Sequence, residues 1–396
     1  MILEQPNGAL ALLADGRAVT SSQIESGVWL DTEDFGRVSI IKTCPHIPTF
    51  SVMPEAIILA ALTTEGRIYV GSKLRKRYED ITSVVSATLE TPITDVSYLF
   101  TSYRNVVIGI GDSFTVLTLP INGSVLMGTL HKFSCMIDLL CFRWNHGLVK
   151  THDGLLYWFG SMYNPQQNRY NSGWGPYKIE FSDVHNIRQV FCVLNYLMLH
   201  MMDGSIYIRK HPSKPEDSND SFVQLPFPEG TSISRVITGH GLPFFITTEG
   251  LCYYSFADLG DPEMRPVLLQ SLQKYVIENI FTLNRCMIIQ FDDYRLCTML
   301  PSLKDLNFDI FGCYKRGIAE HVFLSFFDNK HIVDIIELLG HTCFITDEGY
   351  VYRISGPLDV ADVVITRDPF FDANPLAPKM SAQHIRSALS STHIDA

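Results

Sequence analysis

The sequence has few charged residues and no long apolar run. Only 18% of its 396 residues are charged, while 46% are apolar, a balance that excludes a disordered chain and predicts a large buried core. The longest wholly apolar stretch, Ala56–Leu62, is far shorter than the roughly 20 residues of a membrane-spanning helix. The N-terminal residues also lack the basic and apolar regions of a secretory signal. We therefore expect a cytoplasmic protein, with the nucleus as the alternative location.

Positive charge and paired cysteines are also scarce. Lys and Arg number 31 against 42 acids, for a net charge of −11, and no basic tail is present. This balance argues against a surface built to neutralise nucleic-acid phosphates, so protein partners are expected instead. The nine cysteines are scattered and contain no Cys-x-x-Cys pair, which predicts reduced thiols rather than a disulfide framework or a zinc site. No cofactor or metal is expected.

Local catalytic motifs are absent as well. The sequence contains no His-Glu-x-x-His, no Gly-x-x-x-x-Gly-Lys-Ser/Thr and no Gly-x-Ser-x-Gly, and Gly109-Ile-Gly111 stops short of a dinucleotide-binding fingerprint. Four acids, Asp15, Asp153, Asp203 and Glu348, each directly precede a glycine, where turn geometry alone favours an acid. We therefore predict no catalytic residues and a protein that is not an enzyme.

What the sequence does contain is a repeat. Several apolar residues, a small polar residue, an acid-Gly pair and a short alternating aromatic run recur about eight times. The acid-Gly pair predicts a tight hairpin in which the glycine takes a positive φ. The clear copies have their turn glycine at Gly16, Gly66, Gly154, Gly204, Gly250 and Gly349, and two decayed copies span Val106–Asp112 and Met287–Tyr294.

The spacing of these turns predicts the fold class. The mean step is about 48 residues, the size of one propeller blade. Five copies carry a tyrosine three residues after the turn glycine, namely Tyr69, Tyr157, Tyr207, Tyr253 and Tyr352, and we expect these rings to pack between neighbouring sheets. The interpretation is an all-β protein: a β-propeller over residues 1–366 and a proline-containing tail over 367–396. Within it, Val360–Ile365 is predicted to pair with N-terminal strands and close the ring.

At three places the repeat resembles the regulator of chromosome condensation family. The resemblance rests on Gly239–Gly250, on Gly340–Tyr352, and on His146, which stands eight residues before Gly154 as His341 stands before Gly349. The resemblance implies a diverged member with seven blades. Because the sequence contains eight turns, eight blades are the alternative. We expect His146 and His341 to hydrogen-bond to backbone and lock blade to blade; titration near neutral pH or ligand binding is the alternative.

Segments between the repeats are the candidates for partner contacts. One is the basic cluster 73–77, another is the polar, proline-containing stretch 209–220, and the third is the aromatic-rich stretch 163–175. The third has the composition of an interface, which makes Tyr163, Arg169, Tyr170 and Trp174 the predicted partner-binding residues.

The predicted function is a non-enzymatic protein–protein interaction scaffold. The family resemblance implies an alternative, a guanine-nucleotide exchange factor for a Ran-like small GTPase. A hydrolase with carboxylates converging from separate blades is the third possibility, because a single sequence cannot exclude such convergence. The oligomeric state is left open.

Overall fold

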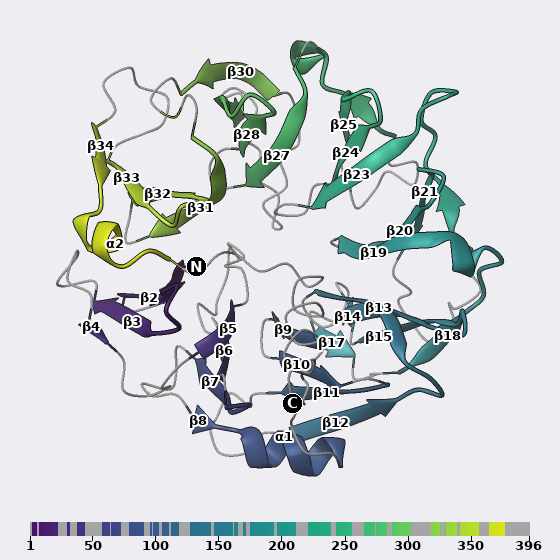
Figure 1. Cartoon of the computed structure of the whole chain (residues 1–396). Helices are drawn as coiled ribbons and strands as arrows, with labels where there is room; N and C mark the ends of the chain where they lie inside the picture. The colour runs from purple at the N-terminus through teal and green to yellow at the C-terminus, as the bar shows by residue number, and fades with distance from the viewer. Residues whose placement is uncertain are drawn as a thin grey trace, which may run out of the picture. The chain divides into compact units, whose positions relative to one another are not determined.

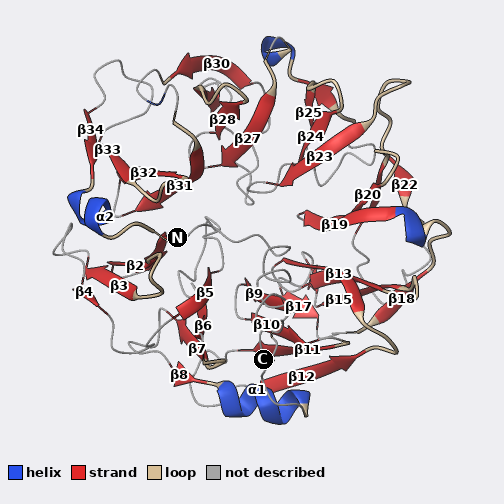
Figure 2. Cartoon of the chain, in the orientation of Figure 1, coloured by secondary structure: helices blue, strands red, loops and turns tan. Residues whose placement is uncertain are grey.

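The structure is a computed structural model, and it describes the greater part of the repeats. The described residues are 2–5, 8–22, 30–31, 38–43, 58–63, 65–72, 79–90, 96, 98–102, 105–110, 112–118, 127–143, 146–160, 162–164, 169–171, 175–193, 196–210, 221–238, 243–255, 265–273, 275–282, 287–301, 318–324, 327, 330–338, 341–355 and 364–376. They are almost entirely β-strands, which are drawn red in Figure 2.

The first compact unit comprises residues 1–47, 51–132 and 322–396 and contains four antiparallel sheets. The first sheet is β1 (Ile2–Gln5), β2 (Gly8–Leu12), β3 (Ala18–Ser22) and β4 (Leu30–Asp31); the second is β5 (Val38–Thr43), β6 (Ile58–Thr63), β7 (Ile68–Ser72) and β8 (Glu79–Asp80). The third is β9 (Tyr98–Ser102), β10 (Asn105–Ile110), β11 (Ser113–Thr118) and β12 (Met127–Lys132); the eighth is β31 (Ile332–Leu338), β32 (His341–Thr346), β33 (Val351–Ser355) and β34 (Val364–Arg367). The unit also contains the helices α1 (Thr82–Leu89) and α2 (Pro369–Ala373).

The second compact unit comprises residues 48–50 and 133–321 and contains the other four sheets, except for the last two residues of β30. The fourth sheet is β13 (Ile137–Arg143), β14 (His146–Thr151), β15 (Leu156–Gly160) and β18 (Tyr177–Ile179); the fifth is β19 (Ile187–Val193), β20 (Tyr196–Met201), β21 (Ile206–Lys210) and β22 (Val223–Gln224). The sixth is β23 (Ile233–Thr238), β24 (Pro243–Thr247), β25 (Cys252–Tyr254) and β26 (Val267–Leu268); the seventh is β27 (Ile277–Thr282), β28 (Met287–Phe291), β29 (Leu296–Pro301) and β30 (Ile318–Phe323). Short 3-10 helices, η1 (Val184–Asn186) and η3 (Gln270–Leu272), precede β19 and β27.

Consecutive four-stranded antiparallel meanders are the blades of a β-propeller, so the predicted all-β propeller class is confirmed. The blade number preferred from the family resemblance, seven, is corrected: the described residues form eight such sheets, one for each turn in the sequence. Both decayed repeats are hairpins. One of them joins β10 to β11, and the other joins β28 to β29 with Tyr294 in the glycine slot at φ 65°.

The acid-Gly turn has the same hydrogen bonds in successive sheets. In the fifth sheet Met201 N–H donates to the Ser205 carbonyl (2.9 Å) and Gly204 N–H donates to the Met201 carbonyl (3.1 Å). The Asp203 carboxylate accepts from Ser205 N–H (2.8 Å). This is a three-residue hairpin loop that needs a left-handed residue in its last position, and Gly204 supplies it with φ 85°.

A β-bulge recurs in the first strand of six sheets, opposite the residue that begins this turn. In the second unit the backbone carbonyls at the bulges accept hydrogen bonds from the preceding sheet. The His200 Nε2 atom lies 2.8 Å from the Ile233 carbonyl oxygen, and Arg235 donates to the Ile277 carbonyl (2.9 Å). The bulges therefore serve as the junctions between consecutive sheets.

Four of the five tyrosines in register after the turn pack against aromatic residues that precede their own sheet. The ring centroids of Tyr157 and Phe133 are 5.1 Å apart, and those of Tyr207 and Phe181 are 5.4 Å apart. The pairs Tyr253–Phe227 and Tyr352–Phe327 repeat the arrangement at 5.5 and 5.7 Å. The partner ring comes from the segment that enters the sheet, so each tyrosine fixes that segment over its blade.

The two ends of the described chain meet in the first unit. Phe371 of α2 and the nearby Leu376 are buried in one cluster with Leu13 of the first sheet and Ile345 of the eighth. Leu13 and Leu376 form an antiparallel bridge, and Ala14 N–H donates to the Pro375 carbonyl at 2.8 Å. In Figure 1 the yellow helix α2 lies beside the purple strands β2 and β3.

The predicted closing strand is corrected by this arrangement. The end of the Val360–Ile365 run begins β34, which pairs with β33 as the last strand of its own sheet rather than with N-terminal strands. The N-terminal sheet instead contacts the segment after β34, within the range that the sequence analysis assigned to the tail.

Candidate functional site

The connections within each sheet differ sharply in length. Those between the second and third strands, which carry the acid-Gly turns, span five residues or fewer in all eight sheets. Those between the third and fourth strands are longer and unequal: 23–29, 73–78, 119–126, 161–176, 211–222, 255–266, 302–317 and 356–363. In an antiparallel meander these longer connections leave the sheet at the end opposite the acid-Gly turns. Among these connections within a sheet, variation in length therefore lies at the end opposite the acid-Gly turns.

The three loops singled out in the sequence all fall at this position. Residues 73–77 lie between β7 and β8, 163–175 between β15 and β18, and 209–220 begin at the end of β21 and run toward β22. The cluster 73–77 and residues 211–220 lie outside the described part of the chain. Topology thus places the candidate segments in equivalent slots, which sequence spacing alone did not reveal.

The aromatic-rich segment forms a hairpin of its own. Strands β16 (Met162–Asn164) and β17 (Arg169–Asn171) pair antiparallel, with Tyr163 opposite Tyr170 and Asn164 opposite Arg169. Three of the four predicted partner-binding residues are thus brought together by backbone register. The fourth, Trp174, lies outside the described residues. We call Met162–Asn171 the inserted hairpin.

The base of the inserted hairpin is held tightly. Trp158 of β15, which is buried, stacks on Tyr177 of β18 with ring centroids 4.6 Å apart. Between them along the chain, Gly175 has φ 64°, and a Cβ there would come within 2.8 Å of the Tyr177 ring and 3.1 Å of the Trp158 carbonyl oxygen. The ends of the connection 161–176 are therefore held together by this stack and by the close approach at Gly175.

The two histidines of the resemblance occupy matching positions. His146 opens β14 opposite Arg143, and His341 opens β32 opposite Leu338, each directly after a two-residue connection. Both positions are at the end of the sheet that carries the long connections. Their side chains lie outside the description, so their blade-locking role stays a prediction.

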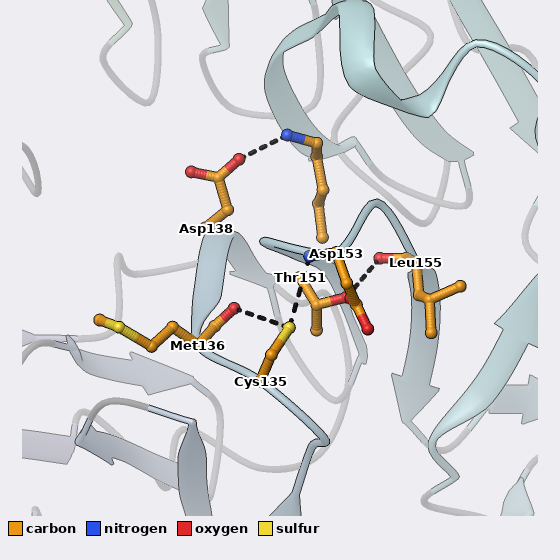
Figure 3. A network of polar contacts seen from close by, with 7 residues as sticks. Cys135, Met136, Asp138, Thr151, Asp153 and Leu155 are labelled. Carbon is orange, nitrogen blue, oxygen red and sulfur yellow. Dashed lines mark hydrogen bonds and ion pairs between the residues drawn. The ribbon is translucent and has the colours of Figure 1, made fainter.

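The carboxylates of two turn acids, Asp153 and Asp203, accept hydrogen bonds from neighbouring residues of their own turns. Figure 3 shows the network at Asp153, where the Thr151 hydroxyl lies 2.6 Å from the carboxylate and Cys135 Sγ accepts from the Asp153 N–H at 3.4 Å. The Thr151 hydroxyl, followed by Cys135, holds the pKa of Asp153 below its ordinary value. Hydrogen bonds from Ser205 likewise lower the pKa of Asp203. These carboxylates are ionised and engaged in the turn, which supports a structural role for them.

Several buried polar groups were not predicted from the sequence. Lys150, which follows the buried Leu148 and Val149 on β14, forms an ion pair with Asp138, and Arg353 pairs with the buried Asp368 at 2.5 Å. Each cation lies in a strand beside buried apolar residues, and each acid lies elsewhere in the sequence of the same sheet. A lysine or arginine among apolar residues of a predicted strand is the sequence signal that could have indicated these ion pairs. Among the described residues, no group of three or more His, Cys, Asp or Glu is arranged to hold a metal ion.

Comparison with known proteins returned structures alone. No family model matches the sequence, and no curated protein matches it. Among solved structures, Prp20p from Saccharomyces cerevisiae, described with its binding to Gsp1p and histones, aligns with 99% of this chain and 96% of its own at 12% identity and a TM-score of 0.46. BamB from Moraxella catarrhalis (10%, TM-score 0.44, 89% of this chain and 94% of its own) and human WBSCR16 (10%, 0.43, 78% and 86%) are also similar. With TM-scores below 0.5, these similarities carry no functional conclusion. No helix in the described part of the chain is long and apolar enough to cross a membrane.

Proposed function

We propose that this chain is a protein-interaction scaffold that binds its partner through the inserted hairpin, which lies in the connection between the third and fourth strands of the fourth sheet. The observation that carries the proposal is the contrast, within each blade, between repeated structural features and variable connections. Turns, bulges and aromatic pairs repeat from sheet to sheet, while the connections between third and fourth strands differ in length, and the one in the fourth sheet contains a hairpin. Loops set on a rigid scaffold are the usual site of partner recognition.

The inserted hairpin fits this role by composition and by anchorage. Tyr163 is paired with Tyr170 in the backbone register, and Arg169 belongs to the neighbouring pair, so residue types frequent in interface hot spots are concentrated in one short element. The Trp158–Tyr177 stack fixes its base. An anchored hairpin binds with little loss of conformational entropy, which favours affinity.

The test compares two loop replacements of equal design. In one variant, residues 162–171 become a Gly/Ser sequence of the same length; in the control, residues 119–126 are replaced in the same way. A photo-crosslinking residue at position 170 identifies the partner, with position 203, on an acid-Gly turn, as the negative site. We expect the partner to crosslink from position 170 and to lose at least tenfold in affinity for the hairpin variant only. Equal affinity of both variants would contradict the proposal.

Guanine-nucleotide exchange for a Ran-like GTPase is the second candidate, and it rests on the sequence resemblance around Gly340–Tyr352. Exchange requires only that the protein stabilise the nucleotide-free GTPase. A panel of small GTPases loaded with fluorescent GDP tests it directly, since an exchange factor accelerates loss of fluorescence. An unchanged rate across the panel would remove this candidate and leave the scaffold proposal standing.

A further inference from the structure

Two cysteines from consecutive sheets of the second unit meet at their sulfur atoms. Cys141 lies on β13 and Cys192 on β19, the first strands of the fourth and fifth sheets, and their Sγ atoms are 2.8 Å apart. A disulfide bond is about 2.05 Å long. Bond formation therefore needs an approach of roughly 0.8 Å, which side-chain rotation and small backbone adjustments supply.

The register of the repeat explains why these two side chains meet. Cys141 pairs with Leu148 in its sheet, and the equivalent position in the fifth sheet is Phe191 rather than Cys192. The cysteines are thus displaced by one residue relative to the repeat. Since successive strand residues point to opposite faces, one cysteine faces the following sheet and the other faces the preceding sheet. Both belong to the apolar cluster between these sheets.

The two thiols differ in access to solvent. Cys192 is buried, with 6% of its surface exposed, whereas Cys141 is partly exposed. A small oxidant in solution can therefore reach Cys141 first, and Cys192 is positioned directly behind it. An accessible thiol next to a second, protected thiol is the arrangement in which a sulfenic acid is captured as a disulfide before further oxidation.

We propose that Cys141 and Cys192 are a reversible oxidation site for hydroperoxides, and that the resulting disulfide cross-links the fourth and fifth sheets. The Cys141 thiolate attacks hydrogen peroxide, the O–O bond breaks, and Cys141 becomes a sulfenic acid as hydroxide leaves. The Cys192 sulfur then attacks the Cys141 sulfur, the S–O bond breaks and a second hydroxide leaves. With the two thiol protons, the products are one disulfide and two water molecules per peroxide.

This site is independent of the proposed partner-binding function. The cross-link joins two blades that otherwise contact only through side-chain packing and hydrogen bonds, and it closes a chain segment of 51 residues. Cross-linking a segment of this length restricts the unfolded chain. Oxidation is therefore expected to raise the unfolding temperature by roughly 5–10 °C.

The experiment treats the purified full chain with hydrogen peroxide, alkylates the remaining thiols, and maps peptides by mass spectrometry without reduction. We expect a disulfide-linked peptide pair containing Cys141 and Cys192, and the higher unfolding temperature, both reversed by dithiothreitol. Cys141→Ala and Cys192→Ala should abolish both effects. Cys135→Ala, which removes another partly exposed thiol of the same unit, should retain both.

Two outcomes would overturn the proposal. One is oxidised protein in which Cys192 is still alkylated as a free thiol while Cys141 has become sulfinic acid. The other is an oxidised chain in which Cys141 or Cys192 is linked to a different cysteine, because the two thiols would then not meet as they do in the structure. If the alanine variants fail to fold, the peptide map of the unaltered chain still decides between these results.

Discussion

Two polar side chains join consecutive sheets of the second unit at the bulges, and of these His200 is buried whereas Arg235 is exposed. Arg235 and His200 contact carbonyls at the bulges of the following sheets, where backbone groups would otherwise lose their partners. Burial is the first cause that lowers the pKa of His200. His131, on β12, shows the largest such effect: its ring lies 4.8 Å from Phe114, and burial lowers its pKa from 6.5 to about 4.

The neutral state of His131 predicts a pH dependence of stability. The unfolded chain binds a proton below pH 6.5, while the folded chain does so only near pH 4, so this histidine lowers the free energy of unfolding progressively as the pH falls between those values. The full effect is at most about 3 kcal/mol. We expect His131→Phe to flatten this part of the profile, measured by urea unfolding at a series of pH values.

A second substitution tests whether the pH dependence comes from His131 in particular or from the loss of any histidine side chain. His152 is exposed on the acid-Gly turn of the fourth sheet, and His152→Gln should reproduce the slope of the unaltered chain between pH 6.5 and 4. A His131→Phe profile parallel to that of the unaltered chain would contradict the assignment.

Two separate structural constraints favour glycine at the turn positions of the repeated hairpin. The first is a positive φ, 85° at Gly204 and 82° at Gly250. The second is close approach by the next sheet: a Cβ on Gly204 would lie 2.7 Å from the Ile233 nitrogen, whereas one on Gly250 would meet only Val276, at 3.6 Å. The Ile233 N–H also donates to the Gly204 carbonyl at 3.0 Å. The junction between the fifth and sixth sheets thus depends on the absence of a side chain.

Alanine substitutions at Gly204 and Gly250 distinguish the cost of the positive φ from the cost of close approach by the next sheet. Gly250→Ala should cost only the strain of the left-handed backbone, about 1 kcal/mol. Gly204→Ala should cost at least about 1–3 kcal/mol more, because backbone of the next sheet must shift. Thermal or denaturant unfolding of both variants measures the difference. Equal destabilisation would show that the approach of the sixth sheet to Gly204 is not constraining.

The first unit depends on contact between segments more than 300 residues apart. Phe371 is fully buried against the first and eighth sheets, and the Leu13–Leu376 bridge lies beside it. Such a contact forms late and orders both ends of the chain together, since a long loop must close before it is made. The segment after β34 therefore stabilises the N-terminal sheet.

Replacing Phe371 tests this dependence. Phe371→Ala should destabilise the protein by about 3–5 kcal/mol and accelerate amide hydrogen exchange in β2 and β3. Asp372→Ala in the same helix removes an exposed ion pair with Arg367 and should change stability by less than about 1 kcal/mol. Unchanged exchange in β2 and β3 of the Phe371 variant would show that α2 does not support the first sheet.

Local chemistry in the sequence was enough to predict the repeat, its hairpin turns and the all-β class, because an acid-Gly pair favours a tight turn and short apolar or alternating runs favour strands, both within a few residues. Tertiary structure alone decided that Val364–Arg367 pairs with β33, that Lys150 meets Asp138, and that Cys141 meets Cys192. These depend on register and on packing between sheets, where a shift of one residue reverses the face a side chain occupies.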